Sequence, residues 1–161
     1  MFCDFVLMKK SDELVRFAKS LGYSKIYFVE DIQKLNIVNG GDLNVNRKAV
    51  ESAKTDILLN PHLVKMKDNL HYRNSGLNQV LCKLAVENNV AIGVSFDSLK
   101  NAVSVGRVMQ NIVLCRKYGV KIMFFSYAKS KNEMRTARDV FGLLEILGLR
   151  GSDAKKALEG L

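Results

Sequence analysis

A run of basic side chains within residues 127–138 is the part of this sequence best suited to chemistry. It holds one acid, Glu133, and four cations, which are Lys129, Lys131, Arg135 and Arg138. Thr136 and Asp139 have the spacing of a capping box, so a helix is expected to begin at this point. A helix N-terminus attracts anions, and Lys and Arg side chains pair with phosphate oxygens. The segment is therefore expected to bind a polyanion.

A second loop with similar features precedes another expected helix. Its sequence is Arg73-Asn-Ser-Gly-Leu-Asn78, and it follows the apolar segment Thr55–Leu59, as the first loop follows Lys121–Phe125. The carboxyl ends of parallel strands meet at one edge of a sheet, which is where α/β proteins bind ligands. The cations expected to converge there are Arg73, Lys129, Arg135 and Arg138. Ser75 and Thr136 are expected to act as N-caps, and a solvated surface is the alternative role for the arginines.

Arg107 stands in the middle of an expected helix, next to its apolar face, in the segment Val105-Gly-Arg-Val-Met-Gln-Asn111. The favoured interpretation is a surface arginine whose aliphatic stem covers the apolar face while its guanidinium reaches water. A contact to RNA or to a partner subunit is the alternative.

Metal and nucleophile chemistry have little support in the sequence. The two histidines, His62 and His71, lack the spacing of a zinc site. For His62, a loop histidine bonded to backbone is favoured over a site residue. The acids near strand ends are scattered, namely Asp4, Asp56 and Asp97. Glycine-rich nucleotide-binding and nucleophile-elbow motifs are absent, and Cys82 and Cys115 fall on apolar helix stripes.

The composition is that of a folded, strongly basic protein. The chain has 161 residues, 48% of them apolar, and a net charge of +9, with a pI of about 9.5. This balance favours a nucleic acid or another anionic partner, with a solvated basic surface as the alternative. No apolar run has the length of a membrane span, and no secretory signal is recognised. Three scattered cysteines indicate reduced thiols and therefore a cytoplasmic protein.

Strand-like and helix-like segments alternate along the chain. The expected strands are Phe2–Met8, Lys25–Val29, Leu35–Val38, Thr55–Leu59, Val90–Phe96 and Lys121–Phe125. The expected helices are Asp12–Leu21, Val45–Ala53, Ser75–Glu87, Ala102–Tyr118, Ala137–Leu147 and Ser152–Leu158. Apolar strands between amphipathic helices predict a parallel sheet covered on both faces. We expect one α/β domain over residues 1–161, a shortened or distorted TIM-like barrel with outer helices, and an open doubly wound sheet as the second choice.

Four segments taken together resemble the ribonuclease P protein component 3 family of archaeal ribonuclease P protein subunits. They are Thr55–Pro61, Arg73–Asn78, Val90–Val94 and Ile122–Gly148. The family is similar in fold to the polymerase and histidinol phosphatase superfamily, a distorted barrel whose enzymes hold metals with His and Asp. Here Cys3-Asp-Phe-Val6 occupies the place where such an enzyme carries His-x-His. The resemblance therefore implies a barrel without metal chemistry.

The resemblance implies a subunit of ribonuclease P, the RNA–protein endonuclease that removes the 5′ leader from precursor tRNA. The RNA, with Mg²⁺, would perform the hydrolysis, and the protein would bind and stabilise that RNA together with a small partner subunit. No catalytic residue and no cofactor are expected in the chain itself. The residues expected to contact RNA are Arg73, Asn78, Arg107, Lys129, Arg135 and Arg138. A metal-dependent phosphohydrolase on the same barrel and a protein-binding scaffold are the alternatives.

Overall fold

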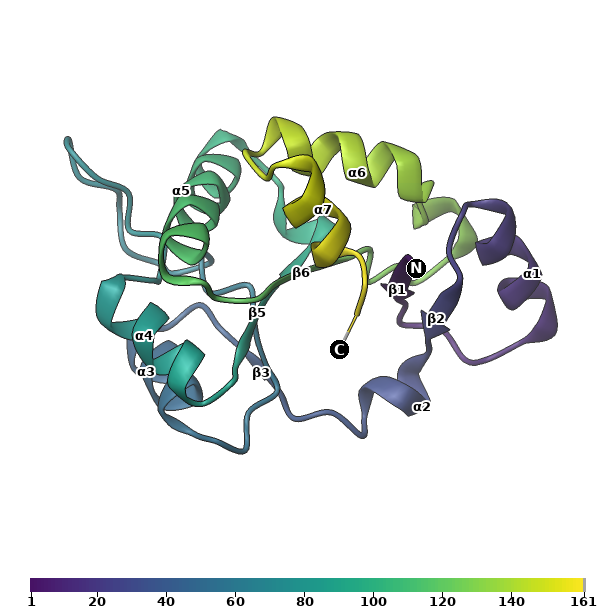
Figure 1. The fold of residues 1–161 in the computed structure, drawn as a ribbon, viewed down its shortest axis with the longest axis horizontal. Coiled ribbons are helices and arrows are strands. Elements are labelled where there is room, and N and C mark those ends of the chain that lie inside the picture. Colours follow the sequence, from purple (N-terminus) through teal and green to yellow (C-terminus); the bar gives the residue numbers. More distant parts are fainter. Residues whose placement is uncertain (161) are drawn as a thin grey trace.

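Apolar segments form short parallel strands in the computed structural model, which describes residues 1–160 (Figure 1). The predicted domain runs one residue further, to Leu161, which lies outside the described residues. The strands are β1 (Cys3–Phe5), β2 (Lys25–Tyr27), β3 (Ile37–Asn39), β4 (Ile57–Leu59), β5 (Ala91–Ser95) and β6 (Ile122–Phe125). All strand pairs are parallel. The predicted α/β architecture with parallel strands is confirmed.

The strands follow one another in the order β3-β4-β5-β6-β1-β2. One sheet contains β3 to β6 and the other contains β1 and β2. A parallel bridge between Val6 and Ala128 joins the two, and the Tyr127 N–H donates to the Phe5 carbonyl at 2.9 Å. Within residues 1–160, β2 and β3 do not pair. The arrangement is consistent with a TIM-like barrel that is open between β2 and β3.

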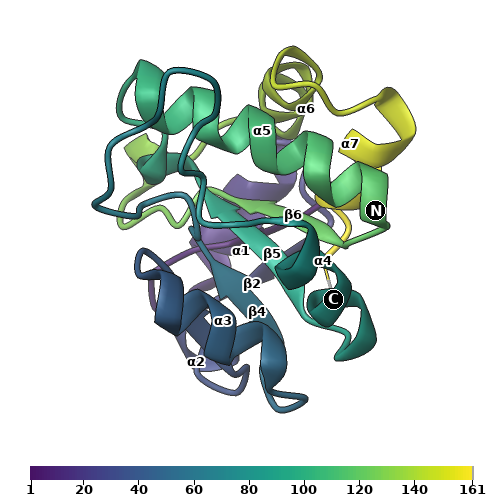
Figure 2. The same ribbon diagram turned by 90° about the vertical axis from the view of Figure 1, so that its left-hand side faces the viewer.

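Helices surround these strands. They are α1 (Asp12–Ser20), α2 (Val29–Ile32), α3 (Leu43–Glu51), α4 (Gln79–Glu87), α5 (Ala102–Tyr118), α6 (Ala137–Ile146) and α7 (Gly151–Ala157), with single 3-10 turns at Phe96–Ser98 and Lys131–Glu133. Figures 1 and 2 show α3, α4 and α5 around the β3–β6 sheet, while α1 and α2 lie beside β1 and β2. No helix of residues 1–160 combines the length and the apolar character needed to cross a membrane.

Both faces of the sheet are buried, as the continuous apolar strands predict. On the inner face, Phe5, Met123 and Phe125 belong to one cluster, and the rings of Phe5 and Phe125 stack with centroids 4.2 Å apart. On the outer face, Leu58 and Phe124 pack against the surrounding helices. Parallel strands buried on both faces fix the positions of the loops at their carboxyl ends.

A buried carboxylate secures the junction between β1 and β6. Asp4 is 2% exposed, and its Oδ1 accepts hydrogen bonds from the Ser126 N–H at 2.7 Å and the Phe5 N–H at 2.9 Å. Its Oδ2 has no hydrogen-bond partner among the described residues. Burial raises the pKa of Asp4 to about 6.

Two element boundaries differ from the sequence prediction for identifiable reasons. The helix expected at Ser75–Glu87 begins at Gln79, because Asn78 is its N-cap and its side chain accepts from the Leu81 N–H at 2.9 Å. Ser75 is therefore not an N-cap. The strand expected at Lys25–Val29 ends at Tyr27, since the short helix α2 begins at Val29.

Candidate nucleic-acid interface

The carboxyl ends of β4 and β5 are joined by polar side chains. The Asn60 amide donates to the Ser95 hydroxyl at 2.7 Å and accepts from the Ser95 N–H at 2.9 Å. The Ser95 hydroxyl in turn donates to Asp97. Asn60 adopts a left-handed backbone conformation with φ of 52°. This network occupies the edge of the barrel at which α/β proteins bind ligands.

The loop after β6 forms a small pocket next to that network. Its volume is about 220 Å³, and its lining residues are Phe96, Asp97, Ser126, Tyr127, Lys129, Glu133 and Arg135. The Arg135 guanidinium lies over the Phe96 ring, 5.4 Å from its centroid. The Lys129 N–H donates to the Glu133 carboxylate at 2.7 Å. Because two acids accompany the two cations, the pocket is balanced in charge rather than strongly positive.

The sequence predicted four converging cations at this edge, and the structure brings only Lys129 and Arg135 into one pocket. Arg73 lines a separate groove of about 370 Å³ beside α5. Arg138 lines a third, largely apolar groove of about 510 Å³ between the end of α1 and the start of α6. The four cations that the sequence placed together therefore lie in three separate surface depressions, formed by segments that come after β4 and β6 in the chain.

Thr136 is the N-cap of α6, as predicted, and its hydroxyl accepts from the Asp139 N–H at 3.1 Å. Lys131 pairs with Glu13 of α1, which connects the loop after β6 to the first helix. Asn78 is exposed and lines the groove of Arg73, while its side-chain oxygen caps α4. Its amide nitrogen is the group left for an outside contact.

The interpretation of Arg107 as a surface side chain is wrong. Arg107 is 6% exposed, and its Nε forms an ion pair with Asp68 at 2.8 Å. Its Nη1 donates to the carbonyls of His62 at 3.1 Å and Val64 at 2.7 Å, and Nη2 donates to that of Met66. A buried guanidinium with these internal partners is not positioned to contact RNA, so its role is to hold the loop after β4.

Arg73 lies against the backbone of α5 at Gly106. A Cβ atom at position 106 would come within 2.5 Å of the Arg73 Nε. The main chain of Arg73 is fixed as well, since Gln110 donates to its carbonyl at 2.8 Å and accepts from its N–H at 3.2 Å. Arg73 is thus an exposed cation on a firmly held backbone.

Both ends of the loop after β4 are fastened by one buried amide. The Asn46 side chain of α3 is fully buried, and its Nδ2 donates to the carbonyls of Pro61 and Gly76, each at 3.1 Å. Its Oδ1 accepts from the Gly41 N–H at 3.2 Å. Gly76 has φ of 77°, and a Cβ atom there would overlap the Pro61 carbonyl oxygen. Only glycine fits at this position.

His62 has a buried ring rather than the backbone-bonded ring that we expected. The residue is 1% exposed, and neither ring nitrogen has a hydrogen-bond partner among the described residues. Burial lowers the pKa of His62 to about 4, which keeps the imidazole neutral. Within residues 1–160, no three His, Cys, Asp or Glu side chains lie close enough to hold a metal ion.

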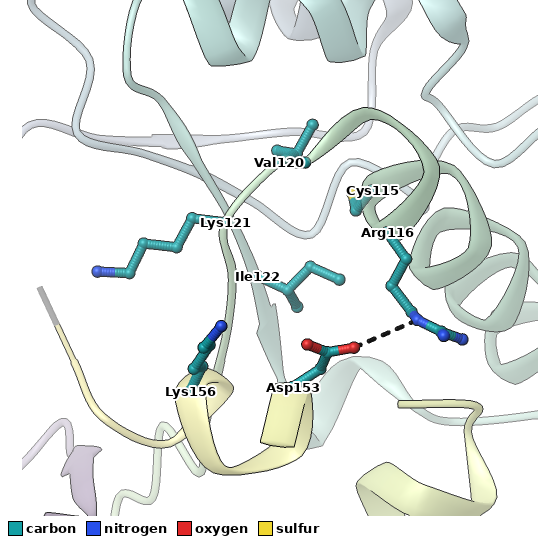
Figure 3. Close-up of a pocket in the computed structure, with 8 residues that line it drawn as sticks. Cys115, Arg116, Val120, Lys121, Ile122, Asp153 and Lys156 are labelled. Atoms are coloured by element: carbon teal, nitrogen blue, oxygen red, sulfur yellow. Dashed lines mark ion pairs between the residues drawn. The ribbon is translucent and has the colours of Figure 1, made fainter. Parts of the chain in front are cut away.

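A further cavity of about 340 Å³ lies at the opposite end of β6 (Figure 3). Three cations line it, but Arg116 is paired with Asp153 at 3.4 Å, and the Lys121 ammonium donates to the Gly160 carbonyl at 2.8 Å. Figure 3 shows Lys121 pointing away from Arg116. Arg116 and Lys121 thus hold α7 and the segment after it against the barrel, and their side chains do not converge on a ligand position.

Apart from His62, residues 62–72 are not among the candidate site residues that the sequence predicts. The signal available was the alternation of Lys65 and Lys67 with apolar neighbours, followed by His71 and Tyr72. The structural role of this segment depends on its contacts with Arg107. Arg107 lies about forty positions further along the sequence than the residues it binds, so the sequence pattern does not reveal these contacts.

Comparison with known proteins identifies the family of this chain. The family model described as RNase P subunit p30 matches residues 32–161. Ribonuclease P protein component 3 of Methanosarcina acetivorans is 35% identical over 152 residues, which is 91% of this chain and 60% of the relative. That of Methanococcoides burtonii is 37% identical over 127 residues, which is 75% of this chain and 49% of the relative. The chain thus spans about half to three-fifths of the length of these relatives.

The fold is also found in a solved structure. A chain in a cryo-EM structure of archaeal ribonuclease P with mature tRNA superposes with a TM-score of 0.67 at 23% identity. The match covers 98% of this chain and 77% of that one. Together with the family match over residues 32–161, these similarities confirm the resemblance noted in the sequence: the chain belongs to the RNase P subunit p30 family.

Proposed function

We propose that this chain is a protein subunit of ribonuclease P that binds and stabilises the catalytic RNA during removal of the 5′ leader from precursor tRNA. Membership of the RNase P subunit p30 family carries the proposal. Its relatives are ribonuclease P protein components, and the structurally similar chain comes from archaeal ribonuclease P with mature tRNA. The net charge of +9 is in keeping with an RNA partner.

The contacts to RNA come from exposed cations on the loops after β4 and β6 and in the first turn of α6. Arg73, Lys129 and Arg138 are exposed, and within residues 1–160 their side chains form no ion pair. Arg135 has its guanidinium turned toward nearby carbonyls and the Phe96 ring, so it makes a weaker contact. Asn78 contributes its amide nitrogen, and Arg107 supports Arg73 indirectly by holding the loop.

In this proposal the RNA, with Mg²⁺, provides the chemistry, and the protein needs no cofactor of its own. The partners are ribonuclease P RNA and other ribonuclease P protein subunits, including a small subunit that pairs with this one. Precursor tRNA is contacted indirectly, and the assembly works in the cytoplasm. The protein's part is to neutralise phosphates that would otherwise repel one another in the folded RNA.

Reconstituted cleavage of precursor tRNA tests the proposal. Replacing Arg73, Lys129 and Arg138 together by Ala should weaken binding to ribonuclease P RNA and reduce the salt slope of log K by about 0.9 for each phosphate that is no longer neutralised. A matched control replaces Lys54, Lys83 and Lys155, which are exposed and belong to neither loop nor to α6. Unchanged RNA binding and cleavage with the first variant would contradict the assignment of these residues.

Two other activities have distinct signatures in the same assays. Metal-dependent turnover of a phosphate ester by the isolated chain would indicate a phosphohydrolase, although no metal cluster is found within residues 1–160. Assembly with a partner subunit that is insensitive to salt, together with no affinity for RNA, would indicate a protein-binding scaffold. Footprinting of ribonuclease P RNA with and without this chain separates these outcomes from the proposed function.

A further inference from the structure

Residues 65–73, which we call the projecting loop, extend from the molecule beyond α5 (Figures 1 and 2). The loop belongs to the connection between β4 and α4, at the carboxyl edge of the sheet. Nearly all of its residues are exposed; Leu70 is 93% exposed and Tyr72 is 60% exposed. Leu70 receives almost no packing from the rest of the protein, and Tyr72 keeps more than half of its surface free while it lines the groove of Arg73.

The projecting loop is nevertheless held in place by α5. Arg107 binds the carbonyls of Val64 and Met66 and the carboxylate of Asp68. Taking a guanidinium out of water is costly, and only several good hydrogen bonds compensate for it. A buried arginine used in this way fixes the first half of the loop in one conformation.

The second half of the loop is fixed by other contacts. The Asn74 N–H donates to the Asp68 carboxylate at 2.9 Å, and the Asn69 N–H donates to the Tyr72 carbonyl at 2.9 Å. Gln110 of α5 bonds to both main-chain groups of Arg73. A preorganised loop loses little conformational entropy when it binds a partner.

The unpaired charges on the projecting loop are all positive. Lys65, Lys67 and Arg73 are exposed, and within residues 1–160 they form no ion pair. The one acid of the loop, Asp68, is neutralised by Arg107. The tip therefore presents an imidazole, a phenol ring and an aliphatic side chain among three free cations.

We propose that the projecting loop binds unpaired bases of a folded RNA, with the Tyr72 ring stacked on a base. His71 and Leu70 pack beside that base, and Lys65, Lys67 and Arg73 neutralise the phosphates on either side. The proposal rests on the proposed function and adds a recognition element to it. Sites for single-stranded nucleic acid combine an aromatic platform with cations in this way.

Unpaired RNA fits this tip better than a duplex or a protein does. In an A-form duplex the base faces are stacked on one another, so the loop would meet phosphates, 2′-hydroxyls and base edges but no base face. A protein partner would need acidic groups opposite three cations within a narrow projection. An unpaired nucleotide supplies both a base face and a phosphate.

Fluorescence and affinity measurements with the full chain test the proposal. The probe is a short single-stranded RNA containing 2-aminopurine, whose fluorescence falls when the base stacks, alone and annealed to its complement. Tyr72→Ala should abolish the quenching and weaken binding by roughly 5- to 150-fold, which corresponds to the loss of one stacked base. Tyr72→Phe keeps the ring and should retain both. Tyr72 is exposed, so neither change disturbs the core.

The lysines are tested by a matched pair of double variants. Lys65→Ala with Lys67→Ala should lower the salt slope of log K by about 1.4, since each single-strand phosphate contact contributes about 0.7. Lys54→Ala with Lys83→Ala removes the same charge from exposed positions away from the loop and should leave the slope unchanged. Equal slopes for the two double variants would contradict the proposed role of the lysines.

The same variants separate this inference from the proposed function. If the wild-type chain protects ribonuclease P RNA and supports cleavage, and Tyr72→Ala does both equally well, the base-binding loop is wrong and the proposed function stands. If the wild-type chain protects no ribonuclease P RNA, the proposed function is wrong, and the 2-aminopurine assay still decides whether the loop stacks on bases. Loss of partner-subunit binding by Tyr72→Ala with unchanged RNA affinity would identify a protein contact instead.

Discussion

Two buried titratable residues impose opposite pH dependences on this protein. Asp4 joins β1 to β6, and burial raises its pKa to about 6 from an ordinary value of 3.8. His62 precedes the projecting loop in the chain, and burial lowers its pKa to about 4 from an ordinary value of 6.5. Each group is therefore more easily neutralised in the folded state than in the unfolded chain.

Single substitutions should expose these two effects, which largely cancel in the wild-type protein. The folded state holds the Asp4 proton more tightly, so its contribution to stability is lost as pH rises from about 4 to 6. The contribution of neutral His62 is present above pH 6.5 and is lost as pH falls toward 4. Each amounts to something on the order of 3 kcal/mol at about 1.4 kcal/mol per unit.

Urea unfolding between pH 4.5 and pH 7 measures the difference. Relative to the wild type, Asp4→Asn should become more stable as pH rises, because only the His62 effect remains. His62→Gln should become less stable as pH rises, because only the Asp4 effect remains. Parallel pH profiles for the three proteins would show that these two residues do not set the pH dependence.

Two glycines should respond in opposite directions to a single methyl group. Gly76→Ala should destabilise the protein by more than about 2 kcal/mol, because its φ is positive and the new Cβ would overlap the Pro61 carbonyl oxygen. Gly142 lies within α6 with open space around its Cβ position, so Gly142→Ala should stabilise by about 0.5–1 kcal/mol. Denaturant midpoints of both variants measure the contrast, and equal shifts would contradict it.

At the scale of elements, α5 is the helix that organises the carboxyl edge. Asn101 and Ser104 form a capping box at its start, and Gly119 ends it in a left-handed conformation. Arg107 and Gln110 are one turn apart, and they hold the beginning and the end of the projecting loop. The position of that loop therefore depends on the register of one helix.

Removing the ion-pair partner of Arg107 should cost much more than breaking a surface pair of similar length. Asp68→Ala leaves a buried guanidinium short of its carboxylate, and a loss of about 3 kcal/mol is expected. Glu51→Ala breaks the exposed Arg47–Glu51 pair, whose atoms are 2.7 Å apart, and should cost less than about 0.5 kcal/mol. Hydrogen exchange of residues 65–73 should accelerate only in Asp68→Ala; equal protection in both variants would contradict the anchoring role.

Most elements could be predicted from the sequence because their signals are local. The α5 helix was predicted at its observed bounds, and Thr136 was correctly identified as the N-cap of α6. Ser75 and Asn78 are both good N-cap residues three positions apart. In the structure Asn78 caps α4, while the Ser75 hydroxyl accepts a hydrogen bond from the distant Gln110 at 2.9 Å, a contact that local sequence does not reveal. The role of Arg107 was misread because its partners are distant in the sequence and lie in an irregular loop.

At the scale of the whole molecule, the strand order could be predicted only in outline. Alternating strands and helices predict parallel neighbours, and β3 to β6 follow that rule. The contact between β1 and β6 joins residues more than one hundred positions apart through the Val6–Ala128 bridge and the buried Asp4. Local periodicity contains no information on such a pairing, nor on the lack of pairing between β2 and β3 within residues 1–160.

The two hydrogen bonds donated by Asn46 separate the loop after β4 from the barrel in a mechanical sense. Because one amide donates to the carbonyls of both Pro61 and Gly76, the chain leaves the barrel and returns to it at the same point, as in an Ω-loop. Changes confined to the exposed residues at the tip of this loop should therefore move β4 and α4 little. The length of the exposed tip is thus set separately from the positions of the strands and helices that flank the loop.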